Sequence, residues 1–543
     1  MKLRYTLRNL EGIRMNSRKL RYLEFTLFLS TFVVSLSLNF ATQKHSFPNP
    51  DTNQIYLFSD LLGKNQTLWF YNELNVKYDV PIFGIRGLLN FGHDYFVPSV
   101  IPGIIVVQAL FKFANVPILL VNPIFVLVGL YFFYKITKIF IFKSGFWSLL
   151  ATVTYFSSGV FIHNSSLPFK DLVATATFFA GLYYILDGIH NKKTSSFALF
   201  GFFAGVTMWM NYPNIIFYLP VLVLHLFTIR KEILERQNLK NFIIAFVFFI
   251  PLFISLYMYQ VTVYDGFLNF NSPLHSLNHY EAFNVRSSIT SFVLNVDVNQ
   301  LLVNFFTQFF LVNPILIAFS ILGFLYVGLD CVMKRRVNKV ITILLVMVAM
   351  QFLFYLGKTW YGEFLLGSVA TSYSRYLLVS WGVLVILSIG AIKRMVEPLT
   401  THQARKGLIL IMLIIYFVVS GLVTGLLAPQ AIKYDIEISE WSHEIRNDIT
   451  KNTPRNSIIF TSYFDKHVFP VRETAVYVAL PKEERLNKTI HLIKELLDDG
   501  YSIYIVDERD DYAISPVLSK DIFEKNGLKT ERAFRNFYRI TLG

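Results

Sequence analysis

Long apolar runs separated by short polar segments dominate the chain. A helix needs a run of about 20 apolar residues to cross a bilayer, and eleven segments meet or approach that length. The pattern therefore predicts a polytopic α-helical membrane protein with about 11 transmembrane helices. These segments are 23–40, 116–134, 145–163, 172–189, 195–211, 213–229, 242–262, 311–333, 340–357, 376–392 and 407–427.

The last part of the chain has a different pattern. Residues 430–543 lack a spanning run and alternate short β-type runs with helical patterns, which predicts a small α/β domain. The expected strands are 457–461, 475–479, 502–506 and 534–541, and the expected helices are 435–450, 484–498 and 516–526. The predicted organisation is a basic cytoplasmic N-terminus (1–22), a transmembrane domain (23–429) with an outer loop at 41–115, and an extracytoplasmic α/β domain (430–543).

The distribution of charge predicts the orientation. The segments between the spans that would be cytoplasmic hold 24 Lys and Arg residues, and the longer outer loops hold nine. The net charge of +14 thus reflects topology and does not call for a nucleic-acid partner. The N-terminus also resembles a signal peptide with cleavage near Ala41, but its long apolar core favours a retained anchor. The single cysteine, Cys331, excludes an internal disulfide.

Polar residues crowd in the first outer loop, which makes it a candidate site. Asn49, Pro50 and Asp51 precede an amphipathic helical pattern with Ile55 and Phe58 on one stripe. The structural explanation of Asp51 is an acid in the first turn of a helix, where it offsets the helix dipole. The functional explanation is a catalytic carboxylate. Spacing alone favours the structural explanation.

Cations mark three places on the predicted outer side. Arg86 stands between glycines, where it would bind an anion or lipid head groups. Lys170 and Asp171 form a pair where the chain re-enters the membrane, either as a solvated helix start or as a charge pair at a cavity rim. Arg375 lies next to Tyr376 before a late span. One acid with several cations at a lipid surface suits a lipid-linked phosphate.

These motifs, in this order, resemble the GT-C fold glycosyltransferases, which use polyprenyl-phosphate-linked sugars and include protein O-mannosyltransferases and the aminoarabinose transferase of lipid A. The resemblance covers roughly residues 20–390. Its motifs are Pro50-Asp51, Phe83-Gly84-Ile85-Arg86-Gly87, Val97-Pro98 to Pro102-Gly103, Pro168-Phe169-Lys170-Asp171 and Ser374-Arg375-Tyr376-Leu377-Leu378.

The resemblance implies an inverting hexosyltransferase at the outer membrane face. Asp51 would act as general base on an acceptor lipid, glycan or protein. Arg86, Lys170 and Arg375 would stabilise the departing donor phosphate, and the spans would form a groove for the polyprenyl tail. With this resemblance, the catalytic explanation of Asp51 is favoured over the structural one. Further site candidates are His93, Asp171 and Tyr376.

The sequence departs from the family pattern in places. Thr52 and Asn53 stand where many relatives carry a second acid, and the Trp-Trp-Asp signature of oligosaccharyltransferases is absent. Transfer of a whole oligosaccharide to asparagine is therefore not expected. The sequence contains no evident metal-ligand set, so no cofactor is indicated and a divalent metal is compatible but unsupported.

Two other functions compete with this interpretation. The first is a polytopic transporter or lipid-sugar flippase. Ion-coupled transporters place ionisable groups near the middle of the bilayer, whereas Asp187 and Asp330 lie near the inner ends of their spans. The second is a sugar-binding scaffold of the same fold that has lost catalysis, which the missing second acid permits.

Overall fold

The computed structural model divides into two compact units. The first, called the helical unit here, comprises Met1–Asn39, Asn122–Leu252 and Phe292–Lys433. The second, called the mixed unit because it holds helices and sheets, comprises Phe40–Val121, Phe253–Ser291 and Tyr434–Gly543. The structure describes residues 17–43, 50–80, 82–84, 88–91, 95–98, 102–229, 236–264, 297–334, 338–356, 369, 372–398, 403–462, 464–477, 485–508 and 520–543.

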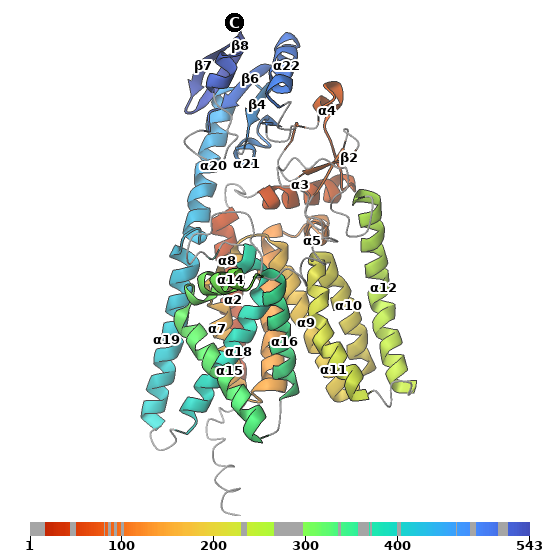
Figure 1. Cartoon of the computed structure of the whole chain (residues 1–543), viewed down its shortest axis with the longest axis vertical. Helices are drawn as coiled ribbons and strands as arrows, with labels where there is room; N and C mark the ends of the chain where they lie inside the picture. Colours follow the sequence, from red (N-terminus) through yellow and green to blue (C-terminus); the bar gives the residue numbers. More distant parts are fainter. Residues whose placement is uncertain are drawn as a thin grey trace, which may run out of the picture. The chain divides into compact units, whose positions relative to one another are not determined.

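Most of the described helices belong wholly or mainly to the helical unit, and Figure 1 labels many of them. They are α2 (Ser17–Gln43), α6 (Val121–Ile136), α7 (Gly145–Phe156), α8 (Gly159–Ser166), α9 (Lys170–Asn191), α10 (Thr194–Met210), α11 (Leu219–Ile229), α12 (Arg236–Tyr264), α14 (Val298–Phe305), α15 (Pro314–Lys334), α16 (Lys339–Tyr355), α17 (Ser372–Tyr376), α18 (Leu378–Val396) and α19 (Gln403–Leu427). Short helical turns join them: η2 (Thr137–Ile141), η3 (Tyr212–Tyr218) and η4 (Phe306–Phe310).

Each segment predicted to span the membrane coincides with helical structure. Among the described residues, seven helices are long and apolar enough to cross a bilayer. The pair α7 and α8, bent by 61° at a short break, makes an eighth if it forms one span. The remaining predicted segments are the shorter apolar helices Thr194–Met210, Tyr212–Phe227 and Lys339–Tyr355. The chain is therefore an integral, polytopic membrane protein.

Helices α9 and α18 form the centre of the helical unit, and most of their residues are buried. Aromatic rings fill the space around them. The ring centroids of Phe133 and Tyr155 are 4.7 Å apart, and the Phe309 ring stacks on Trp381 with centroids 4.9 Å apart. A Cβ on Gly201 of α10 would lie 2.0 Å from the Ala245 carbonyl oxygen of α12. Glycine is therefore required where these two helices approach each other.

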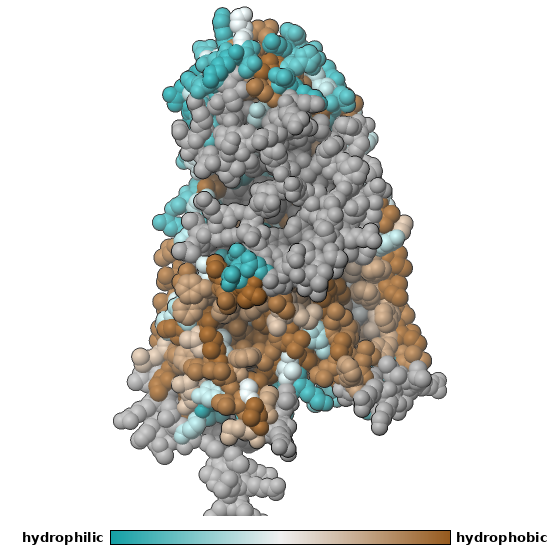
Figure 2. Space-filling view, in the orientation of Figure 1, coloured by the Kyte–Doolittle hydropathy of each residue, from teal (hydrophilic) through white to brown (hydrophobic). Residues whose placement is uncertain are grey.

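On the face seen in Figure 2, hydrophobic residues cover most of the part formed by the long apolar helices. Large apolar side chains on α12, α15 and α19 are about half exposed, among them Phe246, Phe324 and Val419. A protein surrounded by water does not expose apolar side chains on this scale. The same surface is matched to the hydrocarbon interior of a membrane, which supports the conclusion drawn from helix length.

The C-terminal part of the mixed unit is a five-stranded sheet in the order β5-β4-β6-β8-β7. Strand β4 (Ser457–Thr461) pairs in parallel with β5 (Glu473–Val476) and β6 (Ser502–Val506). Strands β8 (Phe537–Leu542) and β7 (Leu528–Phe534) form an antiparallel hairpin at one edge. The helices of this part are α20 (Ile432–Asn452), α21 (Asp465–Val468), α22 (Arg485–Asp498) and α23 (Lys520–Glu524). The predicted α/β domain is thus confirmed, with the hairpin in place of a single last strand.

The first outer loop also belongs to the mixed unit. It contains α3 (Pro50–Asn65), α4 (Glu73–Lys77), α5 (Gly103–Phe113) and a small antiparallel sheet of β1 (Phe70–Tyr71), β3 (Tyr95–Pro98) and β2 (Leu88–Phe91). Helix α3 packs against α5 and buries Ile55 and Phe58, as their helical spacing predicts. The described part of the loop is therefore built of packed helices and strands, and α5 supports α3 from one side.

Candidate functional site

The site residues predicted from the sequence fall into both units. Lys170 and Arg375 belong to the helical unit, and Asp51 and Arg86 belong to the mixed unit. Arg86 and His93 lie outside the described residues, and for Asp51 only the backbone is described. The described part of the predicted site consists of the residues around Lys170 in the helical unit and of the helix that carries Asp51 in the mixed unit.

Lys170 is the first residue of α9, which contacts both α8 and α17. Phe169 is the N-cap residue, and its side chain does not cap the helix. The first N–H groups of a helix carry partial positive charge when no side chain caps them. Lys170 and the helix end therefore bring positive charge to one place beside the Asp171 carboxylate of the same first turn, and a helix end of this kind can stabilise an anion.

Arg375 lies beside this helix end. Its guanidinium carbon is 4.5 Å from the centroid of the Phe169 ring and 5.8 Å from that of Tyr376. The Tyr376 ring stacks in turn on Tyr355, with centroids 5.2 Å apart and planes inclined by 24°. The structure thus brings Arg375 next to the residue that precedes Lys170. Stacking on an aromatic face restricts the orientation of the guanidinium and keeps its positive charge at this place.

Asp171 is buried at the second position of α9, with 2% of its surface exposed. One carboxylate oxygen, Oδ1, accepts a hydrogen bond of 3.2 Å from Asn211 Nδ2 at the end of α10. The other oxygen, Oδ2, has no hydrogen-bond partner among the described residues. A buried polar atom normally has such a partner, so Oδ2 is suited to accept a hydrogen bond from a bound molecule.

Buried amides that the sequence analysis missed support the turn before α9. Asn39 Nδ2 of α2 donates to the Ser165 carbonyl oxygen at 2.6 Å. Asn122 Nδ2 of α6 donates to the Leu167 carbonyl oxygen. These bonds connect two spans to the segment that precedes Lys170. In the sequence, each of these residues is visible only as an amide inside an apolar run, and this pattern does not reveal the partner of the amide.

Helix α3 begins at Pro50, so that Asp51 is its second residue, as the sequence predicts. Another acid of this helix, Asp60, is paired with Lys64 at 2.9 Å and with Lys112 of α5 at 3.1 Å. Burial by itself would raise the pKa of Asp60, but the hydrogen bonds from Lys64 and Lys112 outweigh it and lower that pKa. Asp60 is therefore a structural anion of the helix and provides a comparison for Asp51.

Other acidic groups in the helical unit are engaged in local structure. Asp187, near the end of α9, accepts hydrogen bonds of 2.6 Å from both Asn191 and Ser196. Within the described ranges, no group of three or more His, Cys, Asp or Glu residues is arranged to hold a metal ion. The observed contacts of Asp187 are those of a residue that joins α9 to α10.

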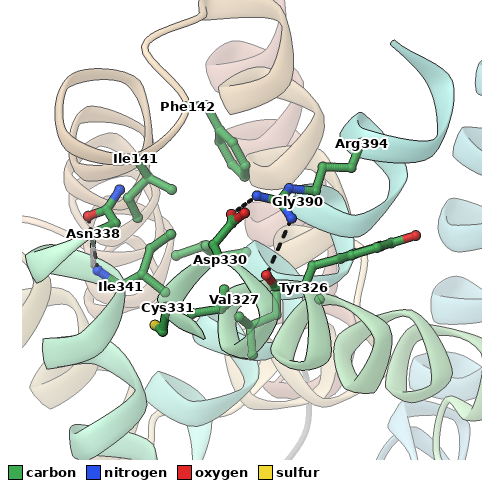
Figure 3. A pocket seen from close by; sticks show the side chains of 13 residues that line it. Ile141, Phe142, Tyr326, Val327, Asp330, Cys331, Asn338, Ile341, Gly390 and Arg394 are labelled. Carbon is green, nitrogen blue, oxygen red and sulfur yellow. Dashed lines mark hydrogen bonds and ion pairs between the residues drawn. The ribbon is translucent and has the colours of Figure 1, made fainter. Parts of the chain in front are cut away.

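A cavity of about 150 Å³ lies between α15, α16, α18 and η2, at the ends of the spans predicted to be cytoplasmic (Figure 3). Asp330 and Arg394 form an ion pair in its wall, and Arg394 Nη1 donates to the Tyr326 carbonyl oxygen at 3.3 Å. The rest of the lining is mostly apolar, including Ile341, and contains none of the predicted site residues. The cavity is therefore separate from the predicted site.

Comparison with known proteins rests on structure alone. No protein-family model matches the chain, and no curated protein sequence matches it significantly. Two crystal structures of ArnT from Cupriavidus metallidurans do match. One, bound to undecaprenyl phosphate, has a TM-score of 0.51 and 10% sequence identity, and the other, in the apo state, has a TM-score of 0.52 and the same identity.

The chain shares the fold of ArnT. Each match covers 95% of this chain and 97% of the ArnT chain, so it includes the spans, the first outer loop and the C-terminal domain. This confirms the predicted GT-C-like architecture. An identity of 10% says nothing about individual residues, and the roles of Asp51, Arg86, Lys170 and Arg375 stay predictions.

Proposed function

We propose that the protein is an inverting glycosyltransferase, which moves a sugar from a polyprenyl-phosphate donor to an acceptor at the outer membrane face. The observation that carries the proposal is the likeness over nearly the whole chain to ArnT, a protein whose crystal structure contains undecaprenyl phosphate. The helix end at Lys170, with Arg375 beside it, supports the proposal because these groups favour a bound phosphate.

In the proposed reaction Asp51 is the general base. Its carboxylate takes the proton from an acceptor hydroxyl or amine while the oxygen or nitrogen attacks the anomeric carbon of the sugar. The bond from that carbon to the phosphate oxygen breaks, and the electron pair leaves with the polyprenyl phosphate. Because the acceptor attacks the face opposite the leaving group, the configuration at the anomeric carbon inverts.

The proposed donor site uses the positive charge at the start of α9. Lys170 and Arg375 would bind the phosphate as its negative charge increases in the transition state, together with Arg86. The ring of Phe169 under the Arg375 guanidinium reduces the conformational freedom of that side chain. Asp171 Oδ2, buried and without a partner among the described residues, would accept a hydrogen bond from a sugar hydroxyl.

Turnover of a defined donor tests the proposal. Purified protein in detergent is given a polyprenyl-phosphate hexose and candidate acceptors, and release of polyprenyl phosphate is followed by mass spectrometry. We expect Asp51→Asn to lose at least 10²-fold in kcat, the lower range for removal of a general base. The matched control is Asp60→Asn, which removes a carboxylate from the same helix and keeps turnover.

Each result has a defined meaning. Full turnover by Asp51→Asn would show that Asp51 is not the base. Equal losses in Asp51→Asn and Asp60→Asn would attribute the effect to a disturbed α3. Failure of the wild-type protein to bind any polyprenyl-phosphate sugar would overturn the proposed function itself and would favour a transporter of another substrate.

A further inference from the structure

The first outer loop completes the sheet of the C-terminal domain. Residues 82–84 run antiparallel to β5, with Phe83 opposite Ala475. The Val476 N–H donates to the Ile82 carbonyl oxygen at 2.8 Å, and the Gly84 N–H donates to the Thr474 carbonyl oxygen at 2.9 Å. The loop thus adds a short edge segment with a single β-bridge, called the docked strand here, which belongs to the same unit as the sheet that it extends.

The docked strand is buried and is also held from its other side. The Ile82 and Phe83 side chains have no exposed surface and share a hydrophobic core with Phe460 of β4. The Phe83 N–H donates to Asn75 Oδ1 at 2.9 Å, and Asn75 Nδ2 donates to the Phe83 carbonyl oxygen at 3.1 Å. Asn75, which is itself fully buried, therefore takes the place of a neighbouring strand.

A second contact joins the C-terminal domain to the start of α3. Asn53 Nδ2 donates to the Lys466 carbonyl oxygen of α21 at 3.4 Å. The same carbonyl accepts a bond of 3.0 Å from Arg446 of α20, which also donates to the Phe469 carbonyl oxygen at 2.9 Å. Asn53 follows Asp51 by two residues on the same helix, so α21 contacts the helix next to the proposed base.

We propose that residues 434–543 position the catalytic helix: the docked strand 82–84 and the contact of Asn53 with Lys466 hold α3, and with it Asp51, in the orientation needed for proton transfer. This inference rests on the proposed function. The C-terminal domain then contributes to the rate without touching the substrate. A displacement of a catalytic group by about 1 Å is enough to lower a rate by roughly 10²-fold.

The test is to loosen the docked strand and to measure catalysis and local order separately. Asn75→Leu keeps the branched shape and the number of non-hydrogen atoms of the side chain but removes both hydrogen bonds to Phe83. In the full-length protein we expect kcat for transfer from a polyprenyl-phosphate hexose to fall on the order of 10²-fold, with donor KM within twofold. Hydrogen exchange of the α3 backbone amides, residues 51–65, should become faster at the same time.

The matched control destabilises the same domain at a distance from the docked strand. Leu528, on β7 at the opposite edge of the sheet, is buried in the same core. Leu528→Ala should lower the melting temperature while kcat stays within threefold and α3 exchange is unchanged. An equal loss of kcat in Leu528→Ala, or an unchanged kcat in Asn75→Leu, would overturn the inference.

The exchange measurement separates this inference from the proposed function. If the wild-type protein turns over no polyprenyl-phosphate sugar, the proposed function fails, and α3 exchange still reports whether the strand holds the helix. Unchanged α3 exchange in Asn75→Leu would overturn the positioning role in either case. Faster exchange that is confined to 82–84 would also overturn it, because the docking would then not reach α3.

Discussion

Truncation of Phe83 measures how strongly the outer loop is attached to the C-terminal sheet. The side chain has no exposed surface and packs in a core with Ile458, Phe460 and Val476. Replacement of a buried phenylalanine by alanine costs about 3–5 kcal/mol, because burial is lost and a cavity remains. The net stability of a domain is about 5–15 kcal/mol. We therefore expect Phe83→Ala to detach the strand locally before the domain unfolds.

Hydrogen exchange of the Gly84 and Val476 amides is the assay, since both donate across the docked pair. Every 1.4 kcal/mol corresponds to a factor of ten, so exchange of both amides should accelerate by roughly 10²–10⁴-fold. Phe83→Leu keeps most of the buried surface and should give an intermediate acceleration. The control is Phe113→Ala on α5, because Phe113 is 77% exposed and the loss of its ring should leave both amides unchanged.

An acceleration below threefold in Phe83→Ala would refute this reasoning. It would mean that backbone hydrogen bonds alone hold the strand, or that the sheet edge at β5 is closed in another way. Equal acceleration in Phe83→Ala and Phe113→Ala would refute it as well, because the effect would then not depend on burial.

Three other changes have defined outcomes. Arg375→Lys loses the planar guanidinium over Phe169, so donor KM should rise roughly tenfold or more in kinetic assays, and a change under twofold would contradict its role in phosphate binding. Burial raises the pKa of Glu473, although a hydrogen bond from Asn72 opposes the shift. The folded protein therefore favours the neutral carboxyl, and it loses stability as the pH rises above the ordinary pKa of 4.5. Glu473→Gln, which cannot ionise, should melt at a higher temperature than the wild type at pH 7 and at the same temperature at pH 4. Arg446→Leu removes the guanidinium hydrogen bonds to the Lys466 and Phe469 carbonyl oxygens, of which Lys466 keeps its bond from Asn53. A carbonyl left unsatisfied costs about 1–3 kcal/mol, so the melting temperature should fall by several degrees, and no shift would show that water replaces the guanidinium.

Local patterns predicted much of the architecture. Among the described residues, the apolar runs located the long apolar helices, since the length of a membrane-spanning helix is set by the bilayer and is visible in the sequence. The start of α3 at Pro50 was predictable because proline fits the first turn of a helix. The orientation of the spans, read from the Lys and Arg residues of the loops, stays a prediction.

Contacts between distant residues needed the tertiary structure. No periodicity reveals that Arg375 lies over Phe169, that Asn39 and Asn122 hold the turn before α9, or that Asn211 bonds to Asp171. A side chain has the same local signature whether it meets solvent, lipid or a distant partner. The helices had to pack before these partners were determined.

The edge strand at 82–84 shows most clearly which features follow from the local sequence and which depend on a distant partner. By itself the segment is a short apolar stretch with a glycine, too short to be identified as a strand. It becomes one because the edge of β5 offers unpaired N–H and C=O groups and the core offers a place for Phe83. The sequence by itself determined which segments are helical and which are apolar. The tertiary structure decided which of them meet, because hydrogen bonds and burial depend on a partner that lies far away along the chain.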